Sequence, residues 1–283
     1  MTQLAAPTTS KPGRDLPVAI AVGVGLLVVV VASLFIRKEA FVVLAALVVC
    51  AGLWELAQAL TRRSIHLPLL PLLVGAVGIL ISSYAAGPEA LFVSFMLTVG
   101  GVVVWRVLDG SGDHALRDAV GGAFAAAYLP FLAGFVMLML AAPDGPARVL
   151  VFILLVVASD TGGYAVGVLL GRHPLAPTVS PKKSWEGLAG SIVLACVVGV
   201  VSVQVAFGGE PITGVFLGLA TVATATLGDL AESMLKRDLE LKDMGRLVPG
   251  HGGILDRLDS LLLTAPAVYI ILTVLQSAVV AGP

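Results

Sequence analysis

The sequence predicts an all-α, polytopic integral membrane protein, and three observations support this prediction. The 283-residue chain is 58% hydrophobic and only 12% charged, and its mean hydropathy is +1.02. Soluble domains carry about a quarter charged residues. Apolar windows of about 20 residues, the length that crosses a bilayer as a helix, recur along the chain. The charged residues gather between these windows, so the net charge of −1 gives no information about partners.

The apolar windows predict about nine transmembrane helices. They lie at 17–36, 40–60, 67–86, 89–107, 119–140, 148–170, 188–207, 211–233 and 261–280. The first follows a tail, 1–16, which is rich in Thr, Pro and Ser and which we expect to be disordered. This first window resembles a signal peptide. However, Arg37 and Lys38 follow it without a small-residue cleavage site, so we interpret it as a retained helix.

The distribution of basic residues predicts the orientation. If the chain crosses the membrane nine times, all but three of its 17 Lys and Arg residues share a side with the N-terminus. The three exceptions are Arg37, Lys38 and Arg148. Basic residues favour the cytoplasmic side of a membrane. We therefore expect the N-terminus and the connection that follows the eighth span to be cytoplasmic.

We expect a single transmembrane domain, 17–283, with no internal repeat. Residues 17–140 carry few polar groups and are interpreted as scaffold or lipid-access helices, whereas 150–262 hold nearly all the side chains suited to chemistry. Cys50 and Cys196 lie in apolar runs, which excludes a disulfide framework or a zinc site of the usual spacing. Glu55 is the lone carboxylate of the second span, and we interpret it as snorkelling or locally paired.

One polar stretch, 228–259, stands out from the apolar sequence around it: GDLAESMLKRDLELKDMGRLVPGHGGILDRLD. If its beginning is helical, four polar side chains share one face: Asp229, Glu232, Ser233 and Lys236. The glycines at 250–253 let the backbone turn sharply. A helix beginning near residue 254 would place Asp256 and Asp259 on one face. Carboxylates on two elements, basic side chains and a glycine turn at a helix start are the parts of a metal-assisted phosphate site.

Two further segments carry candidate residues. Asp160 lies near the middle of the sixth span, where a carboxylate costs about 2.5–3.5 kcal/mol, so we expect it to face a polar cavity. The alternative is a structural hydrogen bond to neighbouring Ser or Thr. The next connection contains SPKKSWEG at 180–187, and its Lys182 and Lys183 could anchor lipid headgroups or contact a triphosphate.

The stretch 233–259, together with SPKKSWEG and the SDT of 159–161, closely resembles the phosphatidate cytidylyltransferase (CDP-diacylglycerol synthase) family. The resemblance is specific over roughly 155–262. It implies transfer of a cytidylyl group from CTP to phosphatidate, giving CDP-diacylglycerol and pyrophosphate in phospholipid biosynthesis. It further implies Mg²⁺ as cofactor, with a second cation left open, and a homodimer in a bacterial-type inner membrane. The membrane lipid is a partner, and no nucleic acid is expected.

The resemblance assigns roles to individual residues. The predicted catalytic residues are Asp229, Lys236, Arg237, Asp256 and Arg257. The predicted substrate- and phosphate-binding residues are Ser180, Lys182, Lys183, Ser233, Lys242, Gly250, His251, Gly252 and Gly253. The predicted metal ligands are Asp229, Asp256, Asp259 and Asp160.

Two other functions stay open at this point. A CTP-dependent polyprenol or dolichol kinase would need a base for a lipid hydroxyl, and the pattern from Lys236 to Asp259 argues against it. A secondary transporter could use an intramembrane Asp and broken helices. Transporters tend to carry repeats with sites in both halves, whereas here the polar residues crowd one end of one half.

Overall fold

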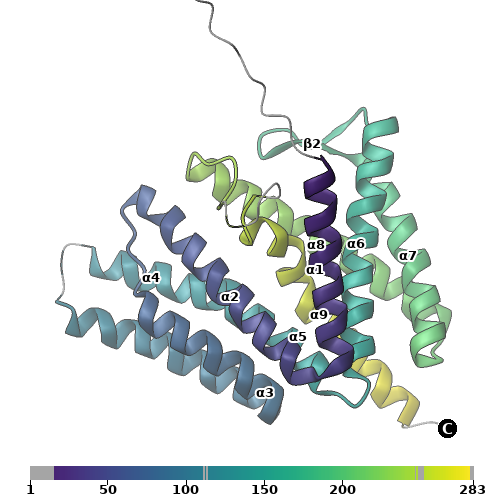
Figure 1. Cartoon of the computed structure of the whole chain (residues 1–283). Helices are drawn as coiled ribbons and strands as arrows, with labels where there is room; N and C mark the ends of the chain where they lie inside the picture. Colours follow the sequence, from purple (N-terminus) through teal and green to yellow (C-terminus); the bar gives the residue numbers. More distant parts are fainter. Residues whose placement is uncertain (1–15, 111, 113, 246, 248–251, 281–283) are drawn as a thin grey trace, which may run out of the picture.

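The computed structural model describes residues 16–110, 112, 114–245, 247 and 252–280, and they form a bundle of long helices (Figure 1). The helices are α1 (Leu16–Ile36), α2 (Lys38–Leu60), α3 (Leu69–Leu108), α4 (Ala115–Ala126), α5 (Leu132–Ala141), α6 (Gly145–Leu170), α7 (Trp185–Phe207), α8 (Pro211–Asp238) and α9 (Leu255–Val280). In this part of the chain, seven helical segments are long and apolar enough to cross a membrane, beside a shorter apolar segment at Leu27–Ile36. The predicted fold class is therefore confirmed. The count of nine crossings and the cytoplasmic N-terminus stay predictions.

Helix α3 is a hairpin of two arms. A straight helix of its 40 residues would measure about 60 Å, twice the thickness of a bilayer core. The chain reverses at Gly87, whose φ of +83° is a conformation that favours glycine, and Pro88 follows it. The arms pack against each other, because Ser82 Oγ donates to Ser94 Oγ at 2.9 Å. The arms correspond to the windows expected at 67–86 and 89–107.

The window expected at 119–140 is built from three consecutive pieces. Helix α4 leads into η2, a π-helical turn (Ala127–Phe131), and then into α5. Pro130 lies in this turn and cannot donate a backbone hydrogen bond, which accounts for the local change of helix type. Tyr128 in the same turn is buried and stacks on Phe124, with 5.5 Å between ring centroids.

The C-terminal helices approach one another through glycines. A Cβ at Gly162 of α6 would lie 2.5 Å from the carbonyl oxygen of Gly190 in α7. Gly199 of α7 likewise faces Gly214 of α8, and Gly228 of α8 faces the backbone of Asp259 in α9. Small residues let membrane helices pack at short distance. The consequence is that polar side chains on α6, α8 and α9 are brought within reach of each other.

The two ends of the bundle differ in charge, as expected from the sequence. Arg63, at the end of the 3₁₀ turn η1 (Thr61–Arg63), pairs with Asp238 at the end of α8. Lys38 and the α5–α6 connection lie together at the other end, where Lys38 Nζ donates to the Ala142 carbonyl at 2.5 Å. Figure 1 shows β2, the start of α1 and the end of α8 at one end, and the end of α9 at the opposite end. The basic connections thus share one end of the molecule.

A small antiparallel sheet adds to the predicted all-α architecture. Strands β1 (Pro174–Ala176) and β2 (Ser180–Ser184) pair in the α6–α7 connection, with Ala176 opposite Ser180. We expected this segment only as a loop. The segment is short and mostly polar, so a search for apolar windows of about 20 residues could not detect it.

Candidate active site

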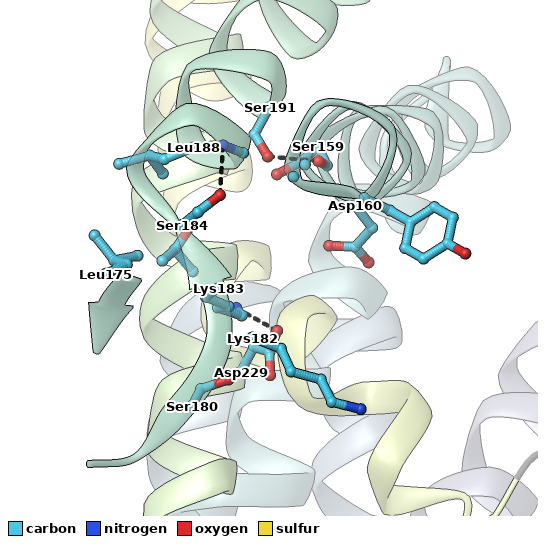
Figure 2. A pocket seen from close by; sticks show the side chains of 15 residues that line it. Ser159, Asp160, Leu175, Ser180, Lys182, Lys183, Ser184, Leu188, Ser191 and Asp229 are labelled. Carbon is cyan, nitrogen blue, oxygen red and sulfur yellow. Dashed lines mark hydrogen bonds and ion pairs between the residues drawn. The ribbon is translucent and has the colours of Figure 1, made fainter. Parts of the chain in front are cut away.

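A cavity of about 360 Å³ lies between α6, the β1–β2 hairpin, α7 and the middle of α8. Its polar lining includes residues far apart in the sequence: Asp160, Ser180, Lys182, Lys183, Ser184 and Asp229. Figure 2 shows Asp160 on its helix facing the lysines of β2. The cavity therefore brings together five of the predicted site residues, namely Asp160, Ser180, Lys182, Lys183 and Asp229.

An ion pair crosses this cavity. The Lys183 ammonium on β2 contacts the Asp229 carboxylate on α8 (Figure 2), and the two side chains are only 26% and 30% exposed. Asp160 on α6 experiences the charges of Lys183 and Arg257 as well as those of Asp229 and Asp259. Positive and negative groups from three elements thus meet at the cavity, as a site for an anion and its counter-cation requires.

The hairpin that carries the lysines is fixed at both edges. Ser184 caps α7, because its Oγ accepts the Gly187 amide at 3.0 Å. Glu186, in the first turn of α7, accepts the backbone amides of Arg172 at 3.1 Å and His173 at 3.2 Å. Arg237 Nε donates to the Val179 carbonyl at 3.4 Å, which ties the hairpin to the end of α8. Arg237, predicted as a catalytic phosphate clamp, is here a contact between α8 and the hairpin.

A second polar group lies where α8 meets the start of α9. Lys236 Nζ contacts Glu232 Oε2 at 2.6 Å and Asp256 Oδ1 at 2.9 Å. The Glu232 side chain is fully buried and that of Asp256 is 7% exposed. Lys236, predicted as a phosphate clamp, therefore bridges two buried carboxylates on adjacent helices.

Asp256 is held by the backbone on its other oxygen. Its Oδ2 accepts the amides of Met244 at 2.9 Å and Gly253 at 3.0 Å. The Gly253 amide therefore already donates to Asp256, although the sequence predicted that it would donate a hydrogen bond to a substrate phosphate. Gly252 adopts a φ of +86°, as a glycine turn requires. The predictions for Gly250 and His251 lie outside the described residues.

The other predicted residues are dispersed around these two groups. Ser233 is half-buried on α8, one turn after Asp229. Asp259 on α9 is within electrostatic reach of Asp229 and Glu232. Arg257 is on the exposed side of the same helix. Lys242 is exposed and lines a separate cavity of about 740 Å³ beside α2, away from Asp160 and Lys183.

Sequence reasoning missed the role of Glu55. Its side chain is buried, and its Oε2 accepts the amide of Leu255, the first residue of α9, at 3.0 Å. The pairing of Glu232 with Lys236, by contrast, was an alternative that the sequence offered. The signal for Glu55 was a lone carboxylate in an apolar span, and the signal for Glu232 was its i to i+4 spacing from Lys236.

The carboxylates suit a hard divalent cation. Among the described residues, no three His, Cys, Asp or Glu side chains are already grouped as ligands. However, Mg²⁺ typically takes one or two protein carboxylates and completes its shell with water and substrate phosphates. Asp229 and Asp160 line the cavity, and Asp259 is within electrostatic reach of both. In the described part of the chain, the buried Glu232 Oε1 receives no hydrogen bond. The oxygen donors present therefore fit magnesium.

Comparison with known proteins identifies the family. A model of the cytidylyltransferase family matches residues 17–275. The chain belongs to the cytidylyltransferase family. This match extends well beyond the segment 155–262 in which the sequence resemblance was specific, and it includes the N-terminal helices.

Three relatives illustrate the extent of the similarity. A phosphatidate cytidylyltransferase of Mycobacterium leprae (strain TN) is 40% identical over 282 residues, covering 94% of this chain and 90% of the relative. One from Mycobacterium bovis is 38% identical over 287 residues, covering 96% and 93%. One from Staphylococcus aureus (strain COL) is 31% identical over 228 residues, covering 78% and 86%. The predicted family resemblance is confirmed.

Proposed function

We propose that this cytidylyltransferase transfers the cytidylyl group of CTP to phosphatidate, forming CDP-diacylglycerol and releasing pyrophosphate. The observation that carries the proposal is the cavity in which Lys182 and Lys183 face Asp160 and Asp229. It occurs in a chain whose relatives, aligned over most of their length, are phosphatidate cytidylyltransferases. The kinase and transporter alternatives have no comparable support.

The chemistry joins two polyanions. A phosphate oxygen of phosphatidate attacks the α-phosphorus of CTP, the bond from that phosphorus to the bridging oxygen breaks, and pyrophosphate leaves with the electron pair. The nucleophile is already an anion, so no side chain needs to act as base. The protein's task is electrostatic, and preorganised cations such as Lys183 lower the repulsion between the reactants. Lys183 is held at the cavity wall by Asp229, so its ammonium is positioned before substrate arrives.

Asp229, with Asp160 or Asp259, would hold the magnesium ion. Bound there, magnesium would supply positive charge to the triphosphate and the departing pyrophosphate. Asp256 is the remaining predicted ligand. Its two oxygens already accept Lys236 and two backbone amides, so ligation by Asp256 would compete with those contacts.

The position of the cavity supports access both for a lipid from the membrane and for a nucleotide from the aqueous side. Tyr164 of α6 lines the cavity and is 74% exposed, and Val168, one turn further on, is 66% exposed. An apolar rim of this kind suits lateral entry of a lipid whose headgroup reaches Lys182. CTP would enter from the end that carries the basic connections, which we assign to the cytoplasmic face of a bacterial inner membrane.

The test is an assay of purified protein in mixed micelles with radiolabelled CTP, Mg²⁺ and either phosphatidate or a polyprenol. We expect CDP-diacylglycerol and pyrophosphate with phosphatidate, and no product with polyprenol. The Asp229→Asn variant should lose at least about 100-fold in kcat, because it removes both a cavity charge and the partner of Lys183. Glu89→Gln, at an exposed position near the α3 turn, is the matched control and should retain full activity.

Formation of CDP together with a phosphorylated polyprenol would refute the proposal in favour of a kinase. Solute flux in liposomes without turnover of either lipid would favour a transporter.

A further inference from the structure

Glu55 is a carboxylate buried in the apolar part of helix α2. Its residue is 2% exposed, and the nearby Leu53 and Leu56 are completely buried. A charged group in such an environment is costly unless it is hydrogen-bonded. Its partners therefore indicate why it is there.

The partners of Glu55 lie about 200 residues away, in the connection between α8 and α9 and at the start of α9. Its Oε2 accepts the amide of Leu255 at 3.0 Å, and its Oε1 accepts the amide of Leu247 at 3.4 Å. Leu255 begins α9, and the first amides of a helix have no partner within the helix. Glu55 thus supplies an acceptor to the start of α9 from a different part of the fold.

Two glycines of the connection make room for this carboxylate. A Cβ at Gly253 would lie 2.7 Å from Glu55 Oε2, and a Cβ at Gly245 would overlap Glu55 Oε1. No side chain could occupy either position without displacing Glu55. The carboxylate is therefore enclosed by the connection on two sides.

Asp256 holds the same connection from the other side. Its Oδ2 accepts the amides of Met244 and Gly253, while its Oδ1 contacts Lys236. Glu55 and Asp256 together fix four backbone amides between Met244 and Leu255. A change at Glu55 would consequently alter how Gly253 and Asp256 are presented beside the site.

We propose that Glu55 is a positioning residue, which sets the α8–α9 connection and the start of α9 in the geometry required for CTP. Its kinetic consequence rests on the proposed function. Glu55→Gln preserves the size of the side chain but replaces one acceptor oxygen with a donor, so one of the two amides faces a second donor. We expect a 10- to 100-fold fall in kcat/KM for CTP, mostly through KM, while the KM for phosphatidate changes less than about two-fold.

Hydrogen exchange gives a readout that does not depend on activity. In Glu55→Gln, the amides of Leu247 and Leu255 should exchange at least about 10-fold faster, while those in the middle of α6 keep their protection. Glu55→Asp, which keeps the charge on a shorter side chain, should restore part of both the protection and the kcat/KM. Glu89→Gln is the control for loss of a carboxylate from the same half and should change neither.

A double-mutant cycle tests the contact itself. Gly245→Ala should impair CTP use in the parent, because the new Cβ overlaps the Glu55 carboxylate. In a Glu55→Ala background, where that space is empty, Gly245→Ala should cause little further loss, so the two effects should be strongly non-additive. Additive effects would overturn the proposed contact.

Other results would also overturn the proposal. One is a KM for CTP in Glu55→Gln that stays within two-fold of the parent value. Another is a uniform loss of hydrogen-exchange protection across α6 and α9, because a uniform loss would indicate a role in global stability alone. If the parent transfers no cytidylyl group, the proposed function fails separately, and the exchange of Leu247 and Leu255 still decides whether Glu55 holds the connection.

Discussion

Replacing Lys236 with methionine tests whether this residue is chiefly a bridge between buried carboxylates. The ammonium lies 2.6 Å from Glu232 and 2.9 Å from Asp256, and it is 19% exposed. Methionine keeps the apolar stem of the side chain and removes only the charge. The variant therefore leaves two buried carboxylates on adjacent helices without their common counter-ion.

The expected magnitude follows from these contacts. At an effective dielectric constant of about 20, each pair attracts by roughly 6 kcal/mol, and desolvation of the ions offsets much of this. Removing one partner of a buried pair leaves the other charge uncompensated, which typically costs about 3–5 kcal/mol. We expect a loss of that size in the free energy of unfolding of Lys236→Met. The double variant Lys236→Met/Glu232→Gln should recover much of the loss, because the fully buried carboxylate is then neutral.

The measurement is an SDS titration of the purified protein in mixed micelles, with cytidylyl transfer followed in parallel. Lys182→Met is the control for stability, because Lys182 is exposed. It should unfold at the same SDS fraction as the parent. The reasoning fails if Lys236→Met is as stable as the parent, or if the added Glu232→Gln destabilises it further. Recovery of stability without recovery of turnover would mean that Lys236 also contacts substrate.

Two further predictions concern the cavity and the helices that form it. Lys183→Met should lower kcat/KM about 100-fold, because the ammonium that pairs with Asp229 supplies positive charge to the phosphates. Lys183→Arg, which keeps a positive charge, should retain part of the activity. Steady-state kinetics with both substrates measure this, and equal activity of the parent and both variants would contradict it. Gly162→Ala should destabilise the protein by about 1–3 kcal/mol, because its Cβ would lie 2.5 Å from the Gly190 carbonyl. Gly78→Ala is its control, since a Cβ there meets nothing within 4 Å; SDS titration compares the two, and an equal response would refute the packing argument.

The helical architecture was predictable because each span carries its own signal. About 20 apolar residues form a transmembrane helix whatever lies elsewhere in the chain, since the bilayer leaves backbone groups no other partners. The reversal in α3 was equally local, because Gly87 and Pro88 separate two such windows. The β1–β2 hairpin lacked a local signal. It depends on contacts such as those of Glu186 and Arg237, which come from other elements.

Part of the candidate site was predictable from the sequence, and its arrangement was less so. Asp160, Lys183 and Asp229 do meet in one cavity, as the expectation of a polar site required. The spacing allowed Glu232 to pair with Lys236, but the sequence could not show that Asp256 also contacts Lys236, because charged residues near a phosphate site look alike whether they contact substrate or each other. Burial distinguishes them, and burial is a property of the packed helices.

The N-terminal half, expected to supply scaffold or lipid-access helices, also contacts the region between α8 and α9. The segment from α2 to η1 contacts this region at two points. Glu55 Oε1 accepts the amide of Leu247 in the connection at 3.4 Å, and Arg63 Nε donates to the carbonyl of Asp238, the last residue of α8, at 2.9 Å. Eight residues of helix separate these points by about 12 Å. The ion pairs of Arg63 with Asp238 and Glu240 are solvent-exposed and contribute little energy. Glu55 and Asp256 already fix four backbone amides of this region from two sides, so its position depends on these contacts more than on Arg63. Arg63→Met should therefore leave the hydrogen-exchange protection of Leu247 and Leu255 almost unchanged, whereas Glu55→Gln should reduce it.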